Sequence, residues 1–193
     1  MRFRLMHLSF LCACLVALLG CASGAAGNSA DSALEHAEVM SLDTPIHVHL
    51  FSTSDTDLGA GSTRDTARAM LKSAPHLLAV DVVDRLRQAG FTRVTLDESD
   101  GDPASDALTL VGRFTVLHPG SQGLRMWIGF GAGKSKVCVE GRLVDADGQE
   151  LTDFSLCRSG LGWGSSAPQL EGESADLGLS IAELLIDWSK AGD

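Results

Sequence analysis

The segment that most constrains the fold is KVCVEGRLVDADGQELTDFSLC, residues 136–157. Apolar and polar side chains alternate along both halves of this segment, as they do in half-buried strands. Asp147-Gly148 between the halves is a strong signal for a two-residue hairpin. Closing the hairpin there places Gly141 opposite Phe154 and Val144 opposite Leu151. The segment therefore predicts two neighbouring strands of an antiparallel sheet.

The same register places Cys138 directly opposite Cys157. Sliding one strand by one residue would send the two cysteines to opposite faces and put Gly141 against Asp153, so the pattern favours the first register. Opposed cysteines in adjacent strands are close enough to bond when their pair is not a hydrogen-bonded one. We therefore predict a Cys138–Cys157 disulfide, with two buried free thiols as the alternative.

The first 21 residues, MRFRLMHLSFLCACLVALLGC, have the order of an export signal. Arg2 and Arg4 precede an apolar run of about 15 residues, which is shorter than the roughly 20 that a spanning helix needs. Leu18-Leu19-Gly20-Cys21 resembles the lipobox of bacterial lipoproteins, and this resemblance implies cleavage before Cys21 and acyl chains, palmitate among them, on that cysteine. An uncleaved anchor and a plain secretory signal are the alternatives.

Domain organisation follows from this N-terminus. We expect a lipoprotein signal peptide over residues 1–20, a lipidated flexible stalk over 21–44 and a single α+β domain over 45–190. Several acyl chains together anchor a protein stably in a bilayer. Ala22 follows the cysteine where an aspartate would favour retention in the inner membrane, so the expected location is the periplasmic face of the outer membrane.

The charge of the chain limits its partners. Cleavage removes Arg2 and Arg4 from the 15 basic residues and none of the 25 acidic ones, so the net charge falls from −10 to −12. An acidic chain without a basic stripe repels phosphate backbones, which disfavours nucleic-acid binding.

Periodicity along the chain predicts a strand, two helices, a strand, a three-strand meander and a last helix. Pro75 interrupts a helical pattern over 63–89, as in the first turn of a second helix, and Gly90 is a natural helix stop. The expected strands before the meander cover 45–52 and 91–96. The last helix is expected over 174–190, with an apolar stripe of Leu177, Ile181, Leu184 and Trp188. The order favours a two-layer α+β domain, with helices on one face of a mainly antiparallel sheet.

The glycine-rich segment GFGAGKS, residues 129–135, does not fit a phosphate-binding loop, because Ile128 stands where the motif needs glycine. A strand bend or close packing of backbones explains the three glycines better. A groove for a peptide or small ligand beside Arg125, Trp127 and Lys134 is the functional alternative.

Motifs that carry chemistry are missing from the sequence. His47 and His49 share one face of a strand, but two ligands do not make a metal site, so no metal and no cofactor are expected. We find no GxSxG or SxxK motif and no cysteine with a plausible histidine partner. The chain is therefore expected to be non-enzymatic, with no catalytic residues.

The run VGRFTVLHPGSQGLRMWIGFGAGKSKVCVEGRLVDADGQEL resembles the bacterial lipoprotein family catalogued as domain of unknown function 4410. The resemblance lies in a glycine-bearing strand, a glycine-bearing turn, an arginine, the GFGAGKS segment and a strand that ends in an aspartate-glycine turn. With the preceding DRLRQAGF it covers most of residues 45–157. It implies the location and the fold but no reaction, and the two cysteines are not part of its pattern.

These observations together predict an outer-membrane lipoprotein that binds another envelope protein or forms homo-oligomers, by strand addition at a sheet edge or through its glycine-rich face. An accessory lipoprotein of a transport or secretion system, carrying a lipid or peptide, is the alternative, and an envelope hydrolase is the third. A sizeable apolar cavity would favour the carrier, and convergent His, Asp and Ser side chains would favour the hydrolase.

Overall fold

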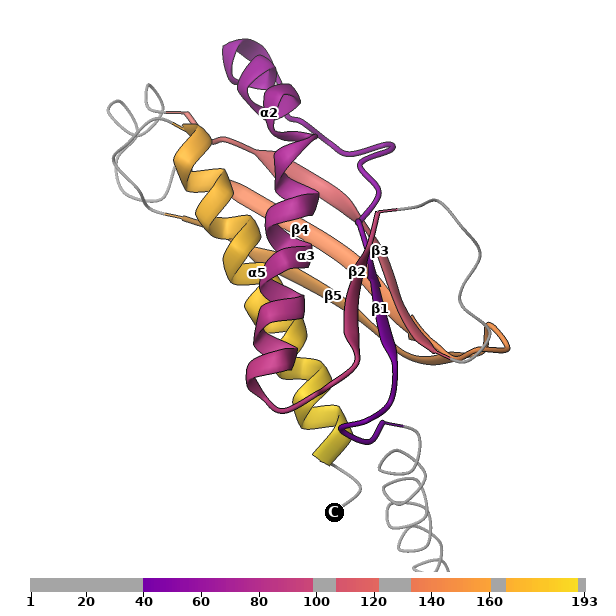
Figure 1. Cartoon of the computed structure of the whole chain (residues 1–193). Helices are drawn as coiled ribbons and strands as arrows, with labels where there is room; N and C mark the ends of the chain where they lie inside the picture. Colours follow the sequence, from indigo (N-terminus) through magenta and orange to yellow (C-terminus); the bar gives the residue numbers. More distant parts are fainter. Residues whose placement is uncertain (1–39, 99–106, 122–132, 161–165, 191–193) are drawn as a thin grey trace, which may run out of the picture.

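The computed structural model describes residues 40–98, 107–121, 133–160 and 166–190 (Figure 1). The expected signal peptide, Cys21, and the groove residues Arg125 and Trp127 lie outside these ranges.

One layer of the molecule is a five-stranded sheet with the strand order β2-β1-β3-β4-β5. The strands are β1 (Ile46–His49), β2 (Val94–Asp97), β3 (Leu108–His118), β4 (Lys136–Val144) and β5 (Glu150–Arg158). β1 pairs in parallel with both β2 and β3, whereas β3, β4 and β5 form an antiparallel meander. The predicted α+β class is confirmed, and the sheet is mixed.

The second layer is helical, and its two long helices lie side by side on one face of the sheet (Figure 1). The helices are η1 (Gly61–Thr63), α2 (Arg64–Met70), α3 (Ser73–Gln88) and α5 (Ser166–Lys190). α2 and α3 carry the chain from β1 back to the start of β2, and such a crossover makes the two strands parallel. α2 extends beyond the end of the sheet (Figure 1).

The helix break near Pro75 is confirmed. The helical pattern divides at Leu71 and Lys72, and Pro75 is the third residue of α3, where its missing N–H removes no helical hydrogen bond. Gly90 follows the end of α3 with φ of +105°, a conformation that glycine adopts without steric cost.

The last helix begins at Ser166, eight residues earlier than the predicted Ser174. Pro168 lies in its first turn, where proline is tolerated, and Leu170 in the added segment is fully buried. The predicted stripe is correct for Leu177 and Ile181, which are fully buried, whereas Leu184 and Trp188 are only partly buried at its margin.

The core fills the space between the sheet and the α3–α5 layer. Its largest fully buried side chains come from both layers: Phe51, Phe114, Ile46, Leu78, Leu86, Leu110, Leu117, Leu143, Leu170, Leu177, Ile181 and Leu185. The end of the expected stalk also contacts this body, because Met40 is buried and Thr92 N donates to the carbonyl oxygen of Leu42.

The β4–β5 hairpin has the predicted register over most of its length. Cys138 lies opposite Cys157 and Gly141 opposite Phe154, and the two cysteines form the predicted disulfide with a Cα–Cα distance of 4.1 Å. The pairing of Val144 with Leu151 was wrong, because Val144 pairs with Glu150 and the register shifts between Leu143 and Val144.

Asp145 explains the register shift at the end of the hairpin. Its side chain accepts hydrogen bonds from the backbone N–H groups of Asp147 at 2.9 Å and Gln149 at 2.8 Å. Gly148 has φ of +80° and donates to the carbonyl oxygen of Asp145. The turn therefore spans residues 145–149, longer than the predicted two-residue turn, and a bulge absorbs the difference.

Candidate functional site

The face of the sheet opposite the helices (Figure 1) carries a shallow groove of about 640 Å³. Side chains alternate between the two faces of a strand, so the paired rows Val111–Arg142–Asp153 and Arg113–Glu140–Ser155 both point away from the core. The groove is lined by Ser52, Val111, Gly112, Arg113, Glu140, Gly141, Arg142, Asp153, Phe154 and Ser155. We call this surface the helix-free face.

Gly112 and Gly141 lie in the sheet below the groove, at positions where a side chain would collide with an aromatic ring of the core. Gly112 and Gly141 are opposite each other in β3 and β4. A Cβ atom on Gly112 would lie 2.7 Å from Cδ2 of Phe51, and a Cβ atom on Gly141 would lie 2.8 Å from Cε2 of Phe154. The rings of Phe51 and Phe154 stack with centroids 6.4 Å apart on the core side. The glycines thus let two aromatic rings approach the sheet backbone.

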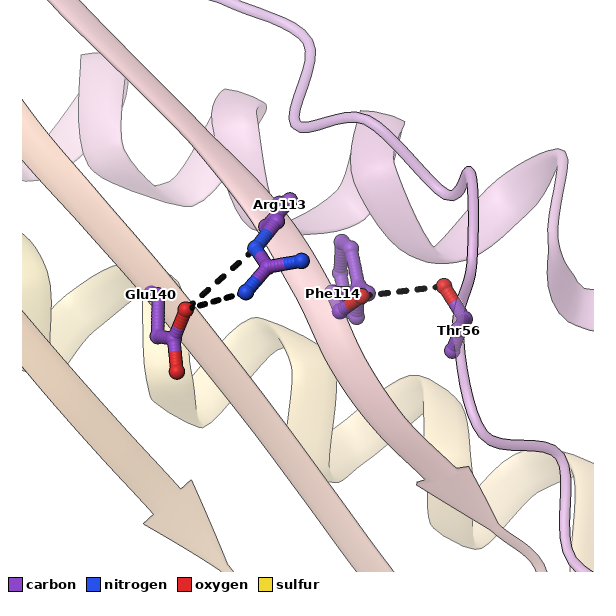
Figure 2. A network of polar contacts seen from close by, with 4 residues as sticks. All are labelled: Thr56, Arg113, Phe114 and Glu140. Atoms are coloured by element: carbon purple, nitrogen blue, oxygen red, sulfur yellow. Dashed lines mark hydrogen bonds and ion pairs between the residues drawn. The ribbon is translucent and has the colours of Figure 1, made fainter.

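Charged side chains on the helix-free face form ion pairs across neighbouring strands. Arg113 donates from Nε at 3.2 Å and from Nη2 at 2.8 Å to Oε2 of Glu140, as Figure 2 shows. Arg142 Nη1 lies 3.9 Å from Oε2 of Glu150. The Arg113 and Glu140 side chains are 56% and 48% exposed, so they remain accessible to a partner.

The chain after β1 runs along β3 and borders this face. Thr56 Oγ1 donates to the carbonyl oxygen of Phe114 at 3.0 Å (Figure 2). It also donates to the carbonyl oxygen of Thr53 at 2.8 Å. Asp57 Oδ2 lies 3.0 Å from Nε2 of His118, and Asp57 Oδ1 accepts from the backbone N–H of Gly59. These contacts lower the pKa of Asp57, the hydrogen bond from Gly59 most strongly and then the one from His118.

A second polar cluster is buried where β4, β5 and α5 meet. Ser135 and Glu173 are buried and hydrogen-bonded to each other, and Ser135 Oγ also accepts from the N–H of Gly160 at 3.3 Å. Oε2 of Glu173 and both polar side-chain atoms of Gln169 have no hydrogen-bond partner among the described residues. Burial raises the pKa of Glu173, although the hydrogen bond from Ser135 opposes this shift.

The sequence-predicted site residues are only partly described. Lys134 is exposed at the start of β4 and does not line the groove, while Arg125 and Trp127 lie outside the described residues. Cys138 and Cys157 lie on the helix-free face, in the row next to Arg113 and Glu140.

His47 and His49 share one strand face, as predicted, and the structure adds a carboxylate between them. Asp97 Oδ2 lies 4.0 Å from Nδ1 of His47 and 3.7 Å from Nε2 of His49. Within the described ranges, no three His, Cys, Asp or Glu side chains are arranged to hold a metal ion. The parallel β1–β2 register, which pairs His49 with Asp97, creates this contact and was not anticipated.

Sequence analysis also missed the Ser135–Glu173 and Asp57–His118 contacts. Glu173 lies in the part of α5 that precedes the predicted helix start at Ser174, and Asp57 is 61 positions from His118 in the sequence. One signal could have found the first cluster. Leu170, Ser174 and Leu177 are spaced as on one helix face, so the helical period continues upstream of residue 174, and all three residues are buried.

The family model for a domain of unknown function, DUF4410, matches residues 29–172. The chain belongs to this family. The match includes β1 to β5, α2, α3 and the first turns of α5, and the resemblance noted from the glycine-bearing strands is thus confirmed.

Two solved structures match this DUF4410 chain over most of its length at low sequence identity. The PelC dodecamer from Paraburkholderia phytofirmans is 15% identical, with a TM-score of 0.45, over 75% of this chain and 91% of that one. Protein XCC0632 from Xanthomonas campestris, of family DUF330, is 11% identical, with a TM-score of 0.43, over 74% of this chain and 84% of that one. No curated protein matches the chain. No helix among the described residues has both the length and the apolar character needed to cross a membrane.

Proposed function

We propose that this DUF4410 protein is a non-enzymatic lipoprotein, held at the periplasmic face of the outer membrane through Cys21, whose α+β body binds another envelope component. The proposal is supported by one observation above all. The helix-free face presents exposed, ion-paired charges around a shallow groove, beside the edge strand β5, which pairs only with β4 among the described residues. Complementary charges on such a surface give specificity for a protein partner.

The groove argues against the carrier alternative. A lipid carrier needs an apolar cavity that removes acyl chains from water. Four charged side chains line this groove instead: Arg113, Glu140, Arg142 and Asp153. A hydrolase would need a serine or cysteine with a base at the groove, and the carboxylate of Glu140, which lies opposite Ser155 in the ladder, is held there by Arg113.

The tether is tested by replacing Cys21 with serine. We expect wild-type protein in intact cells to incorporate a palmitate analogue and Cys21→Ser to incorporate none. Equal labelling of both proteins, or labelling of neither, would reject lipid anchoring at this cysteine.

The binding role is tested by crosslinking in intact cells and mass spectrometry of captured proteins. Arg113→Glu reverses a charge on the helix-free face, and Arg68→Glu in α2 is its matched control. Arg68 is 59% exposed and pairs with Asp65 at 2.7 Å, much as Arg113 is 56% exposed and pairs with Glu140 at 2.8 Å. We expect one protein to be captured by wild type and Arg68→Glu and lost with Arg113→Glu. Recovery of co-purified lipid without any reproducible protein would favour the carrier.

A further inference from the structure

The Cys138–Cys157 disulfide joins two cysteines in unlike surroundings. Cys138 is only 4% exposed, whereas Cys157 is exposed. Cys138 of β4 lies between Val116 of β3 and Cys157 of β5. β5 is the outermost strand on its side of the sheet in Figure 1, and no strand pairs with its outer edge among the described residues. The disulfide therefore has a closed side at β3 and an open side beyond β5.

This asymmetry decides which sulfur an external thiol can attack. In thiol–disulfide exchange a thiolate approaches one sulfur from the side opposite the sulfur that leaves, so access on that side controls the reaction. The S–S bond joins side chains of neighbouring strands and so leads from β4 to β5. Sγ of Cys157 is approached from beyond the edge strand, whereas Sγ of Cys138 is approached from β3, where Val116 lies. The strand order thus selects Cys157 as the sulfur attacked and Cys138 as the one that leaves.

The charges beside the disulfide favour the approach of a thiolate, although the chain as a whole has a net charge of −10. Lys136 is exposed and lies two residues before Cys138 in β4, so both side chains project from the same face. On the other side of Cys138, the carboxylate of Glu140 is held by Arg113. A cation near a sulfur attracts an incoming thiolate and stabilises the thiolate that leaves.

The hairpin has other contacts that hold it together when the disulfide opens. The ladder continues on both sides of the bond, with Val137 opposite Arg158 and Val139 opposite Leu156. Arg158, next to Cys157, also donates to the side-chain oxygen of Ser180 in α5. The two cysteines therefore stay opposite each other after reduction, so the bond can open and close without unfolding of the domain.

We propose that the Cys138–Cys157 disulfide is a reversible exchange site, at which a dithiol reductant attacks Sγ of Cys157. The bond between the two protein sulfurs breaks, and its electron pair passes to Sγ of Cys138, which leaves as a thiolate and takes up a proton. A new S–S bond joins Cys157 to the reductant. The second thiolate of the reductant then attacks the reductant's own sulfur in that bond, so the reductant leaves as a disulfide and Cys157 as a thiol. Two electrons pass from the reductant to the protein.

This site goes beyond the binding role proposed above, because the exchange requires no partner on the groove. Its chemistry also depends on neither the tether nor the location of the protein. Capture of a protein partner in cells and reduction of the purified protein are thus independent measurements, and either can fail without the other.

The choice of sulfur is tested with a matched pair of full-length variants. Cys138→Ser leaves Cys157 as a free thiol, and Cys157→Ser leaves Cys138. Each variant is mixed with oxidised glutathione, and peptide mass spectrometry assigns the modified cysteine and its rate of modification. We expect Cys157 to be modified about tenfold faster than Cys138, or more, because access controls exchange. Equal rates, or faster modification of Cys138, would overturn the proposal.

Reduction of the folded protein is tested with dithiothreitol and wild type. The rate of disulfide loss is measured without urea and at several urea concentrations below the unfolding transition. Attack on the folded chain gives a rate that hardly changes with urea, and this is the result we expect. Attack that requires global unfolding gives a rate that rises as steeply as the unfolded population. Such a rise would contradict an exchange site built into the folded sheet.

The role of Lys136 is tested by charge removal. Lys136→Gln should slow reduction of the disulfide by glutathione, which is an anion, about two- to threefold at low ionic strength. Lys72→Gln is the matched control, because it makes the same change in net charge at an exposed position before α3, away from the disulfide. Equal effects of the two variants would show that only net charge matters and would reject the role assigned to Lys136.

Discussion

Gly178 lies where α5 crosses α3, and replacing it with alanine tests the closest contact between the two helices. A Cβ atom at this position would lie 2.4 Å from the carbonyl oxygen of Leu78 and 3.0 Å from Cβ of Asp81. Ordinary contacts of a Cβ atom begin at 3.4 Å. The obstacle is backbone within a helix, which cannot rotate aside as a side chain can, so the helices would have to separate by about 1 Å.

Two opposing terms give the expected size of the effect. Alanine in place of glycine in a helix interior favours folding by about 1 kcal/mol. Overpacking a close-packed contact costs about 1–3 kcal/mol, and here the displaced helix carries the fully buried Leu177 and Ile181. We expect Gly178→Ala to lower the free energy of unfolding by up to about 2 kcal/mol, or the melting temperature by up to about 6 °C.

Gly172 in the same helix is the matched control, because a Cβ atom there would meet nothing within 4 Å. Gly172→Ala should gain helix propensity alone and raise the free energy of unfolding by up to about 1 kcal/mol. Urea unfolding of the full chain, followed by circular dichroism, compares the two variants with wild type. If Gly178→Ala is stabilised as much as Gly172→Ala, the close approach of α3 and α5 does not exist in solution.

Three further measurements test particular contacts. Burial raises the pKa of Glu173 in the folded state above the unfolded-state pKa of about 4.3. The protonated carboxyl therefore stabilises the fold fully below about pH 4.3, and this stabilisation is lost as the pH rises through the folded-state pKa. Urea unfolding of Glu173→Gln should therefore show it becoming more stable than wild type as the pH rises from about 4, and Glu171→Gln replaces an exposed carboxyl of the same helix as the matched control. Reducing the Cys138–Cys157 disulfide, which spans 19 positions, should lower the free energy of unfolding by about 2–4 kcal/mol, and a double alanine variant should not respond to the reductant. Gly112→Ala should cost about 1–3 kcal/mol in thermal melting, because its Cβ atom would lie 2.6 Å from the backbone oxygen of Glu140, and an unchanged midpoint would contradict that contact.

The pattern of residue types along the chain correctly predicted several structural features that depend on residues close together in the sequence. Strict alternation and two cysteines predict the β4–β5 register, because a slip of one residue would reverse every side chain. The helix break near Pro75 and the helix stop at Gly90 follow from backbone chemistry at single residues. The start of α5 was missed, because the residues before Ser174 are mostly polar and their buried apolar residue, Leu170, joins the core only in the folded chain.

The candidate site was less accessible to prediction. Sequence analysis did not single out Gly112 and Gly141 as positions of close packing, and nothing local shows that Phe51 and Phe154 fill the space beside them. The Arg113–Glu140 ion pair needs the β3–β4 register, which a short hairpin signal could not supply because residues 119–135 separate the two strands.

For this protein, the sequence by itself determined the helix break near Pro75, the helix stop at Gly90, and most of the register of the hairpin whose two strands are neighbours along the chain. The tertiary structure alone decided that β1 lies between β2 and β3, that Asp97 meets His47 and His49, and that Glu173 is buried against Ser135. The reason is that periodicity depends on residues a few positions apart. Strand order and buried polar contacts depend on how α3 and α5 together cover one face of the whole sheet, which minimises exposed apolar surface over the entire chain.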